Sequence, residues 1–561
     1  MFSSCEPQQQ NDDCQHYHPV HHQAKAATCI SQGNIQFWHC KDCGTYFSDR
    51  FCEHPITEAE TVIDIDPNNH KYQGAYTYDY DEMEYVRTCA YNNEHVEKVA
   101  AGNGQYPILV RNADELQKAI AKNGYIKLEN DITLDSGVKI QSKNKVEINL
   151  NGKTVSGSAE YLFYIDIGNV ESAFTRIKNG TIKNTNTSEQ CYGLYIVDGA
   201  NKSSVYLDNC VIEVNEQGQS NGVGVYISRD DAGKTVTVEL TNSTVKASFA
   251  GVYFDGPSRF VLNKTDVTAG AYGIYDNYGS NAEMTDGSIT APIGVRSLYI
   301  FTMTRGTITA TELAISVKYS TYDYPRLGWD EIPPDSYFNM LTLLQISGAT
   351  ITSSGTGIEL QTAYAYVKNT SINTAGDSIK VFRDVLLIMD TCQLISENGM
   401  GIVGNGTVDI NNENCGIDTH IQLTDCSIAA TWGVYLPQTD GIFTMTGGKI
   451  QASVTGIEIR AGKATLKGVE IESTAQAFST SENAATSACI LGAAVAVSQG
   501  STNNDIEVTI RNCTLKGVYA FYEADLIDSV SENLTVTFEG TNTIEGDVYS
   551  QNCDSIPEAT R

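Results

Sequence analysis

The sequence predicts an all-β protein, a right-handed parallel β-helix solenoid that follows a small N-terminal Cys/His module and one capping helix. Three observations support this prediction. A six-residue motif recurs with a base period near 22 residues, strand-forming residues dominate after about residue 106, and seven of the 15 cysteines fall within the first 89 residues. Plentiful glycine and scarce proline, 47 and 12 residues, fit many short strands joined by tight turns.

The N-terminal cysteines come first along the chain and have the spacing of a metal site. A Cys-x-x-Cys pair precedes a glycine, with a further cysteine and a histidine upstream. Zinc takes four sulfur or nitrogen ligands in a tetrahedron, and a Cys-x-x-Cys turn supplies two of them. A disulfide-linked or metal-free loop is the alternative. The predicted ligands of a structural zinc are His21, Cys29, Cys40 and Cys43, and the competing histidines are His18, His22 and His39.

This stretch, "HHQAKAATCISQGNIQFWHCKDCGTYFSD", resembles small Cys/His modules that recur in surface proteins of gut anaerobes. In those modules a histidine precedes Ala-Thr-Cys, and an aromatic segment with Cys-x-x-Cys-Gly follows. The resemblance covers about 30 residues and implies the same four ligands. A second, decayed copy follows, in which His70 and Cys89 fit the pattern, asparagine replaces the last cysteine and His95 stands nearby. The sequence alone therefore gives no complete ligand set for a metal in the second copy.

One helix is expected directly before the repeats, over residues 112–123. Asn112 is a good N-cap, Glu115 follows it by three residues, and Gly124 provides a stop signal. Beyond this helix the chain has strand-like segments to its end.

The repeated motif reads apolar, x, small-or-Asn, x, x, apolar. Its copies begin at residues 150, 177, 207, 240, 262, 284, 303, 346, 367, 389, 423, 445, 466 and 510. A second pattern, Gly-apolar-x, recurs in step with it and often ends in tyrosine. A unit near 22 residues holds three short strands, whereas a propeller blade needs about 40 residues or more. The repeats therefore predict a parallel β-helix.

In such a stack each residue lies above its counterpart in the preceding coil. The apolar motif positions should point inward, and the Asn, Asp and Gly positions should form a ladder of turns with left-handed backbone. Small-residue stacking also accounts for four cysteines that share one motif position, Cys210, Cys392, Cys426 and Cys513.

From about residue 106 to 550 the pattern resembles the pectate lyase-like β-helix superfamily, and "VRNADELQKAIAKNGYIKLENDITL" looks like the capped start of such domains. The resemblance implies the fold and leaves the function open. Galacturonase-type enzymes of this fold use Asn-x-Asp, Asp-Asp and Gly-His-Gly. Here Asp230-Asp231 is the only Asp-Asp in the repeats and Gly-His-Gly is missing. No catalytic residue is predicted, and a polysaccharide lyase or glycoside hydrolase is the alternative to a binding protein.

A row of outward tyrosines favours binding. In "GVYFDG", Val252 and Phe254 should point inward and Tyr253 and Asp255 outward. Sugars pack their C–H faces on aromatic strips, although tyrosines also stack simply because they suit a sheet surface. The same position in other coils is expected to hold Tyr195, Tyr226, Tyr275, Tyr435 and Tyr519, and elsewhere Arg296, Glu359 and Glu458.

The insertion at 318–339 has six aromatic residues, so it should either pack on the coil or present a binding face. Its aromatic residues are Tyr319, Tyr322, Tyr324, Trp329, Tyr337 and Phe338. The predicted ligand-binding residues of the whole chain are Tyr253, Asp255, Tyr275, Tyr322, Tyr324, Trp329 and Tyr337.

Charge and termini suggest where the protein works. A net charge of -31 disfavours nucleic acid and anionic membranes. No apolar stretch approaches 18 residues, so no transmembrane helix is expected. The opening Phe-Ser-Ser-Cys resembles the end of a bacterial lipoprotein signal, which implies a lipid anchor at Cys5 and a cell-surface or extracellular location.

Together these features predict a surface or secreted adhesion protein that recognises glycans through the side of the β-helix. The expected organisation is a flexible tether over 1–16, Cys/His modules over 17–104, the β-helix over 105–553 and a short tail over 554–561.

Overall fold

The chain forms two compact units, residues 1–109 and residues 110–561, which are described separately. The computed structural model describes residues 14–141, 145–166, 173–187, 189–197, 203–215, 221–228, 236–256, 258–318, 343–382, 385–404, 419–437, 441–480, 490–499, 505–525, 534–551 and 556. The predicted lipid-anchor residue Cys5 and the aromatic residues of the 318–339 insertion lie outside these residues.

The N-terminal unit consists of small antiparallel sheets. Its first sheet has the order β1-β3-β4-β5, its second pairs β2 with β6, and its third has the order β7-β8-β9. A one-turn helix, α1 (Glu58–Thr61), starts with a capping box between Thr57 and Glu60. The strands are β1 (Pro19–His22), β2 (Gly33–Asn34), β3 (Phe37–Cys40), β4 (Tyr46–Phe47), β5 (Pro55–Ile56), β6 (Val62–Ile63), β7 (Thr77–Asp79), β8 (Glu84–Thr88) and β9 (Val96–Ala100).

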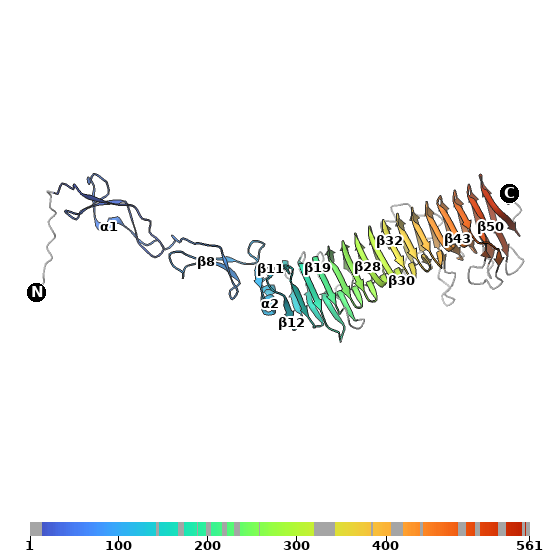
Figure 1. Cartoon of the computed structure of the whole chain (residues 1–561), viewed down its shortest axis with the longest axis horizontal. Helices are drawn as coiled ribbons and strands as arrows, with labels where there is room; N and C mark the ends of the chain where they lie inside the picture. Colours follow the sequence, from blue (N-terminus) through green and yellow to red (C-terminus); the bar gives the residue numbers. More distant parts are fainter. Residues whose placement is uncertain are drawn as a thin grey trace. The chain divides into compact units, whose positions relative to one another are not determined.

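The second unit is the predicted parallel β-helix, in which 41 strands from β10 (Ile108–Val110) onward form one hydrogen-bonded assembly (Figure 1). The chain winds through three parallel sheets, named A, B and C here, and each strand pairs with its counterpart in the next coil. The predicted hand of the winding is right-handed, which is the hand that crossovers between parallel strands favour.

Sheet A contains β11 (Gly124–Leu128), β14 (Lys145–Asn149), β21 (Val236–Thr241), β24 (Ser258–Asn263), β27 (Asn281–Met284), β29 (Ile300–Met303), β31 (Leu344–Ser347), β34 (Ala363–Lys368), β37 (Val385–Asp390), β40 (Thr419–Thr424), β42 (Ile442–Thr446), β44 (Gly462–Lys467), β49 (Ile506–Arg511) and β51 (Leu534–Glu539). Sheet B contains β12 (Ile132–Leu134), β15 (Thr154–Gly157), β22 (Thr244–Ala247), β25 (Thr265–Ala269), β32 (Ala349–Ser353), β35 (Ser371–Thr374), β38 (Gln393–Ser396) and β45 (Glu470–Ser473).

Sheet C contains β13 (Val138–Gln141), β16 (Tyr161–Asp166), β18 (Cys191–Val197), β20 (Gly222–Ser228), β23 (Ala250–Phe254), β26 (Tyr272–Asp276), β33 (Thr356–Gln361), β36 (Ile379–Val381), β39 (Met400–Gly404) and β48 (Ala493–Gln499). Longer strands pass from A to B or from B to C: β17 (Phe174–Asn184), β19 (Ser203–Val214), β28 (Gly287–Ser297), β30 (Gly306–Lys318), β41 (Ser427–Leu436), β43 (Lys449–Ile459), β50 (Thr514–Asp525) and β52 (Thr543–Ser550). A short hairpin, β46 (Ser479–Thr480) with β47 (Ile490–Leu491), stands apart from the sheets.

The apolar motif positions stack inward, as predicted. From Ile177 to Ile510 the first residue of every motif copy is fully buried, and neighbours in the register are motif neighbours in the sequence. The four cysteines that share a motif position are buried too, at 3% exposure or less. Each coil therefore adds a layer to one continuous apolar core, which is how solenoids gain stability.

The predicted turn ladder is also present. In twelve of the fourteen motif copies the third residue has a positive φ, for example Asn179 at 59° and Asn209 at 54°. The other two copies place a positive-φ glycine one residue later, at Gly287 and Gly306. The asparagines are linked along the stack, since the Asn209 side-chain amide donates to Asn179 Oδ1 at 3.1 Å. Asparagine suits these positions because it tolerates left-handed backbone.

The predicted helix is α2 (Ala113–Lys122), which precedes the first coil. Asn112 caps it by accepting a hydrogen bond from the Glu115 amide at 3.0 Å. The Glu115 carboxylate turns back to accept from the Arg111 amide at 2.7 Å. Leu116, Ala119 and Ile120 are buried, so the helix covers the apolar end of the solenoid. No helix in the described residues is both long and apolar enough to cross a membrane.

Candidate functional site

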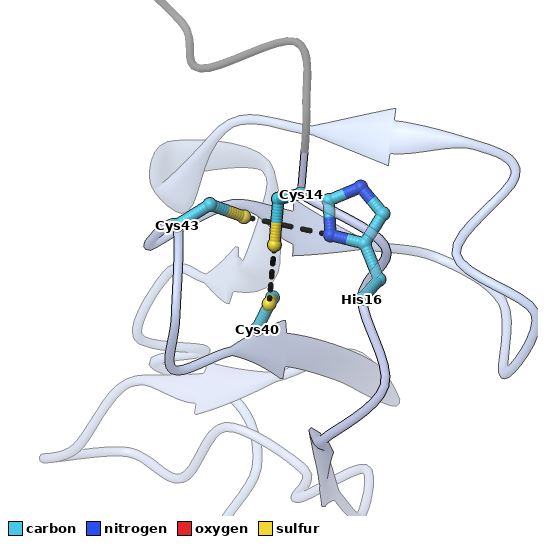
Figure 2. Close-up of side chains that lie close together, drawn as sticks. All are labelled: Cys14, His16, Cys40 and Cys43. Atoms are coloured by element: carbon cyan, nitrogen blue, oxygen red, sulfur yellow. Dashed lines mark hydrogen bonds between the residues drawn. The ribbon is translucent and has the colours of Figure 1, made fainter.

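The N-terminal unit contains a cluster of three cysteines and one histidine: Cys14, His16, Cys40 and Cys43 (Figure 2). This group is called the first cluster. Cys40 ends β3, and the turn after it is closed by hydrogen bonds from the Cys40 amide to the Thr45 carbonyl and from the Gly44 amide to the Cys40 carbonyl, at 2.9 and 2.8 Å. Gly44 has φ 76°, the left-handed conformation expected of the glycine after the Cys-x-x-Cys pair.

The spacing of the four ligand atoms fits a tetrahedral metal. Cys14 Sγ lies 3.6 Å from Cys40 Sγ, and Cys43 Sγ lies 3.5 Å from His16 Nδ1. Zn–S and Zn–N bonds of about 2.3 and 2.05 Å require S–S and S–N edges of about 3.8 and 3.6 Å in a tetrahedron. A disulfide would need about 2.05 Å between the sulfurs. The cluster could therefore hold a metal ion, and its donors suit zinc.

The thiols of the first cluster titrate differently. Burial acts against ionisation of Cys43, but hydrogen bonds with Thr45 and with the neighbouring thiols lower its pKa to about 6. A backbone hydrogen bond at His16 favours the Cys14 thiolate, yet desolvation and the neighbouring cysteines raise the pKa of that thiol to about 11. One thiolate is thus available near neutral pH, and a bound cation would draw the others into the ionised form.

The structure divides the four predicted zinc ligands between separate places. Cys40 and Cys43 lie in the first cluster, whereas Cys29 lies beside His70 and His95. The His21 ring stacks on Trp38, with ring centroids 4.7 Å apart. The competing histidines are engaged elsewhere: His18 lies 3.7 Å from an Asp42 carboxylate oxygen, His22 stacks on Phe37 and His39 stacks on Tyr46.

Cys14 and His16 complete the first cluster, although the sequence-based division assigned them to a flexible tether. The signal that could have identified them is the Cys-x-His spacing at Cys14 and His16, which recurs at Cys52 and His54. A short pair of this kind mirrors the Cys-x-x-Cys pair, because both present two ligands from one turn of chain.

On the β-helix, sheet C carries an unbroken row of five outward tyrosines, one from each of five successive coils, called the tyrosine row. Its members in register are Tyr164, Tyr195, Tyr226, Tyr253 and Tyr275. Neighbouring ring centroids are 5.3, 4.9, 5.3 and 4.8 Å apart. All five side chains are half-buried, whereas Val252 and Phe254 beside Tyr253 are fully buried, as predicted.

A cation closes each end of the tyrosine row. The Lys139 ammonium lies 5.4 Å from the Tyr164 ring centroid, and the Arg296 guanidinium lies 5.0 Å from the Tyr275 ring centroid. Arg296 also donates to the Tyr275 hydroxyl at 3.2 Å. Both residues occupy the register position of the row in the coils beyond it. Cation–π contact therefore covers the terminal ring faces.

A second rank of aromatic residues supports the row from one side. Tyr192 is 7% exposed and packs with Val223 and Ala250, against which rings of the row also pack. Tyr272 lies 4.5 Å from Tyr275, centroid to centroid. Burial raises the pKa of Tyr192 to about 12, so its hydroxyl stays protonated at physiological pH. Packing on this side holds the rings of the row in fixed orientations.

The glycine of the Gly-apolar-Tyr pattern lies near the start of its sheet C strand, as Gly224 does in β20 and Gly251 in β23. A Cβ built on Gly224 would lie 2.6 Å from the Gly251 carbonyl oxygen, and one on Gly251 would lie 2.8 Å from that of Gly273. No larger residue fits at these positions without moving backbone. The pattern therefore places a tyrosine two residues after each such glycine.

Asp255, the predicted acidic neighbour, lies beside the row. Its carboxylate accepts from the Tyr226 hydroxyl at 3.1 Å and from the Asn277 side-chain amide at 3.3 Å. Burial and this carboxylate raise the pKa of Tyr226. Asp276, in the same region, is 1% exposed, and its carboxylate accepts four backbone amides, including those of Gly279 and Ser280. Asp276 therefore holds a turn and does not face a ligand.

Farther along the stack, two of the residues predicted to extend the tyrosine row are buried. Tyr435 and Glu458 share the register but are buried, at 4% and 0% exposure. The register places Tyr522 opposite Ala496 in that row and Tyr519 opposite Ala493, three residues earlier on each strand, so the assignment of Tyr519 is corrected to Tyr522. The Gly-Val-Tyr copy at 517–519 therefore precedes the register position of the row by three residues. Tyr322, Tyr324, Trp329 and Tyr337 lie outside the described residues.

The fold and these sites define the chain as an all-β solenoid protein with a Cys/His cluster near its N-terminus. No protein family model, no curated protein and no solved structure matches it. The functional argument therefore rests on the geometry of the sites.

Proposed function

We propose that this protein binds neutral glycans through the tyrosine row, outside the cell or on its surface. The observation that supports the proposal is the alignment of five half-buried phenol rings at the spacing of adjacent parallel strands, about 4.8 Å. A linear glycan running along the stack would meet the outer edge of one ring and one hydroxyl group per coil. Sugar C–H groups would contact the exposed ring edges, and sugar hydroxyls would exchange hydrogen bonds with the phenols.

Charge favours a neutral ligand. The chain carries a net charge of -31, which repels polyanions at long range. The cations nearest the row, Lys139 and Arg296, are engaged with its terminal rings. Asp255 adds an acceptor for sugar hydroxyls close to Tyr226 and Tyr253.

The test is a glycan array on the full chain, followed by calorimetry with the best ligand and a reducing-sugar assay. Tyr253→Ala should weaken binding about five- to tenfold, because an aromatic contact contributes about 1 kcal/mol. The matched control is Tyr206→Ala, which removes an outward, half-buried tyrosine of sheet A that packs under the Arg176 guanidinium. Equal binding by both variants would refute the proposal, and release of reducing ends would favour the enzymatic alternative.

The first cluster is proposed to hold a structural zinc ion. Three sulfurs and one imidazole nitrogen form a closed tetrahedral set, which is typical of structural sites and leaves no open position for catalysis. Protein purified without chelator under reducing conditions should contain zinc that Cys40→Ser removes. Retention of all bound zinc by Cys40→Ser would contradict the proposal.

A further inference from the structure

A second group of metal-ligating side chains lies elsewhere in the N-terminal unit, formed by Cys29, His70, Cys89 and His95 and called the second cluster. One ligand atom each of Cys29, His70 and His95 lies within 4.8 Å of the others. Cys29 Sγ is 3.8 Å from Cys89 Sγ and 3.3 Å from His95 Nδ1. The sulfur separation equals the edge of about 3.8 Å that tetrahedral zinc requires and is far from a disulfide bond.

The two cysteines of the second cluster are buried, its two histidines are half-buried, and one imidazole nitrogen lacks a hydrogen-bond partner among the described residues. Cys29 is 7% exposed and Cys89 is 1% exposed. Within the described part of the chain, the Nδ1 atom of His70 is buried without a hydrogen-bond partner. The His70 and His95 rings meet edge to face, with centroids 5.0 Å apart. A buried imidazole nitrogen without a partner is costly, and a bound metal would satisfy the polar atoms of this cluster.

Backbone hydrogen bonds bring together the segments that carry the second cluster. The Cys29 amide donates to the Asn69 carbonyl at 3.2 Å, directly before His70. The Cys89 amide donates to the His95 carbonyl at 2.9 Å, which closes the turn that presents both residues. Tyr72 forms a β-bridge with Cys89, so the segment after His70 lies beside the same turn. Three separate segments are thus held with their ligands converging.

The four ligands come from two parts of the unit. Cys29 belongs to the loop between β1 and β2, whereas His70, Cys89 and His95 belong to the part that contains β7, β8 and β9. The described part of residues 14–106 buries only seven apolar side chains, and three of them are cysteines of the two clusters. These seven are Ala27, Cys29, Phe37, Cys40, Phe47, Met83 and Cys89. Because the apolar core is so small, a cross-link between the two parts would add to the stability of the unit.

We infer that the second cluster is a second zinc site, with two thiolates and two imidazoles, which joins the two parts of the N-terminal unit. It differs from the first cluster in composition, with Cys₂His₂ against Cys₃His donors, and shares no residue with it. The sequence pattern did not suggest it, because the second copy of the Cys/His module lacks its last cysteine. Cys29, which the pattern assigns to the first copy, supplies the missing sulfur.

The test is metal analysis of the full chain, purified under reducing conditions without chelator. We expect two zinc ions per chain in the native protein, one in Cys89→Ser and in His95→Gln, and two in the control His18→Gln, whose histidine is exposed. Cys40→Ser should also retain one. A native stoichiometry of one ion that Cys40→Ser abolishes would overturn the inference while leaving the first site intact.

Cobalt distinguishes the sites even if a variant loses part of its fold. Co²⁺ bound to Cys40→Ser should show tetrahedral d–d bands and the weaker thiolate charge-transfer absorption of a two-sulfur site. Co²⁺ bound to Cys89→Ser should show the stronger charge-transfer absorption of a three-sulfur site. Thiol counting on the native protein checks the remaining alternative. The inference would be overturned if protein isolated from the cell contains a disulfide between Cys29 and Cys89 and no metal at the second cluster.

Discussion

In the β-helix each coil adds apolar side chains to columns that run the length of the unit, whereas the N-terminal unit buries seven apolar side chains among its described residues 14–106. The β-helix has hydrogen-bond partners above and below nearly every strand, while the N-terminal unit has sheets of two to four short strands. The comparison teaches that apolar burial can support the β-helix, whereas the small core of the N-terminal unit leaves its stability to the proposed metal sites.

Removal of metal should have the largest effect and should act on one unit only. A strong chelator under reducing conditions is expected to unfold residues 14–106, because zinc binding by such sites contributes about 10–16 kcal/mol of apparent folding free energy. The β-helix should stay folded. Limited proteolysis with mass spectrometry would locate the new cleavage sites, and added zinc should restore protection. Full protection of the N-terminal unit in protein shown to be free of metal would break the comparison.

The opposite change is a cavity in the β-helix. Phe260 is fully buried and meets Phe254 edge to face, with centroids 5.4 Å apart. Phe260→Ala should cost about 3–5 kcal/mol, since it removes a large ring from a packed column. Denaturant titration of the β-helix would measure the loss, and the zinc content of the N-terminal unit should not change. An unaltered unfolding midpoint would show that the columns contribute less than their burial suggests.

Most of the β-helix could be predicted because the sequence period maps directly onto contacts. Leu207 and Leu240 are 33 residues apart in sequence but neighbours in the register, since the extra residues are inserted between strands. The ligand clusters lack such a rule. Cys29 is eleven residues from Cys40, yet backbone hydrogen bonds to the Asn69 segment direct it to His70 and His95. The tyrosine row was found from its repeat, but the repeat did not reveal that Tyr435 and Glu458 are buried. The Glu458 carboxylate accepts from the Ile490 amide at 3.3 Å, and Ile490 lies in β47, outside the repeated strands.

A smaller effect is expected at the turn ladder, where the backbone conformation itself is tested. Asn209 has φ 54°, and its side chain donates to Asn179. Asn209→Ala should cost about 1–2 kcal/mol because alanine resists left-handed backbone, in addition to the lost hydrogen bond. Asn209→Gly loses the same hydrogen bond but tolerates the conformation, so it is the matched control. Equal unfolding midpoints for the two variants would assign the whole effect to the side chain.

The last prediction tests the same conformational strain in the N-terminal unit. Gly44 has φ 76°, and a Cβ built on it meets no atom within 4 Å, so Gly44→Ala introduces conformational strain without a steric clash. In the β-helix about 1–2 kcal/mol of strain lowers the unfolding midpoint. The proposed zinc sites would couple folding of the N-terminal unit to metal binding, so the same strain should appear as zinc affinity weakened about tenfold at the first cluster. Competition with a chelator of known affinity measures this change, and Gly104→Ala is the control, because its Cβ also meets no atom within 4 Å and φ is not positive there. Unchanged zinc affinity in Gly44→Ala would mean that the turn after Cys43 forms independently of the metal, and the contrast between the two units would then rest on burial alone.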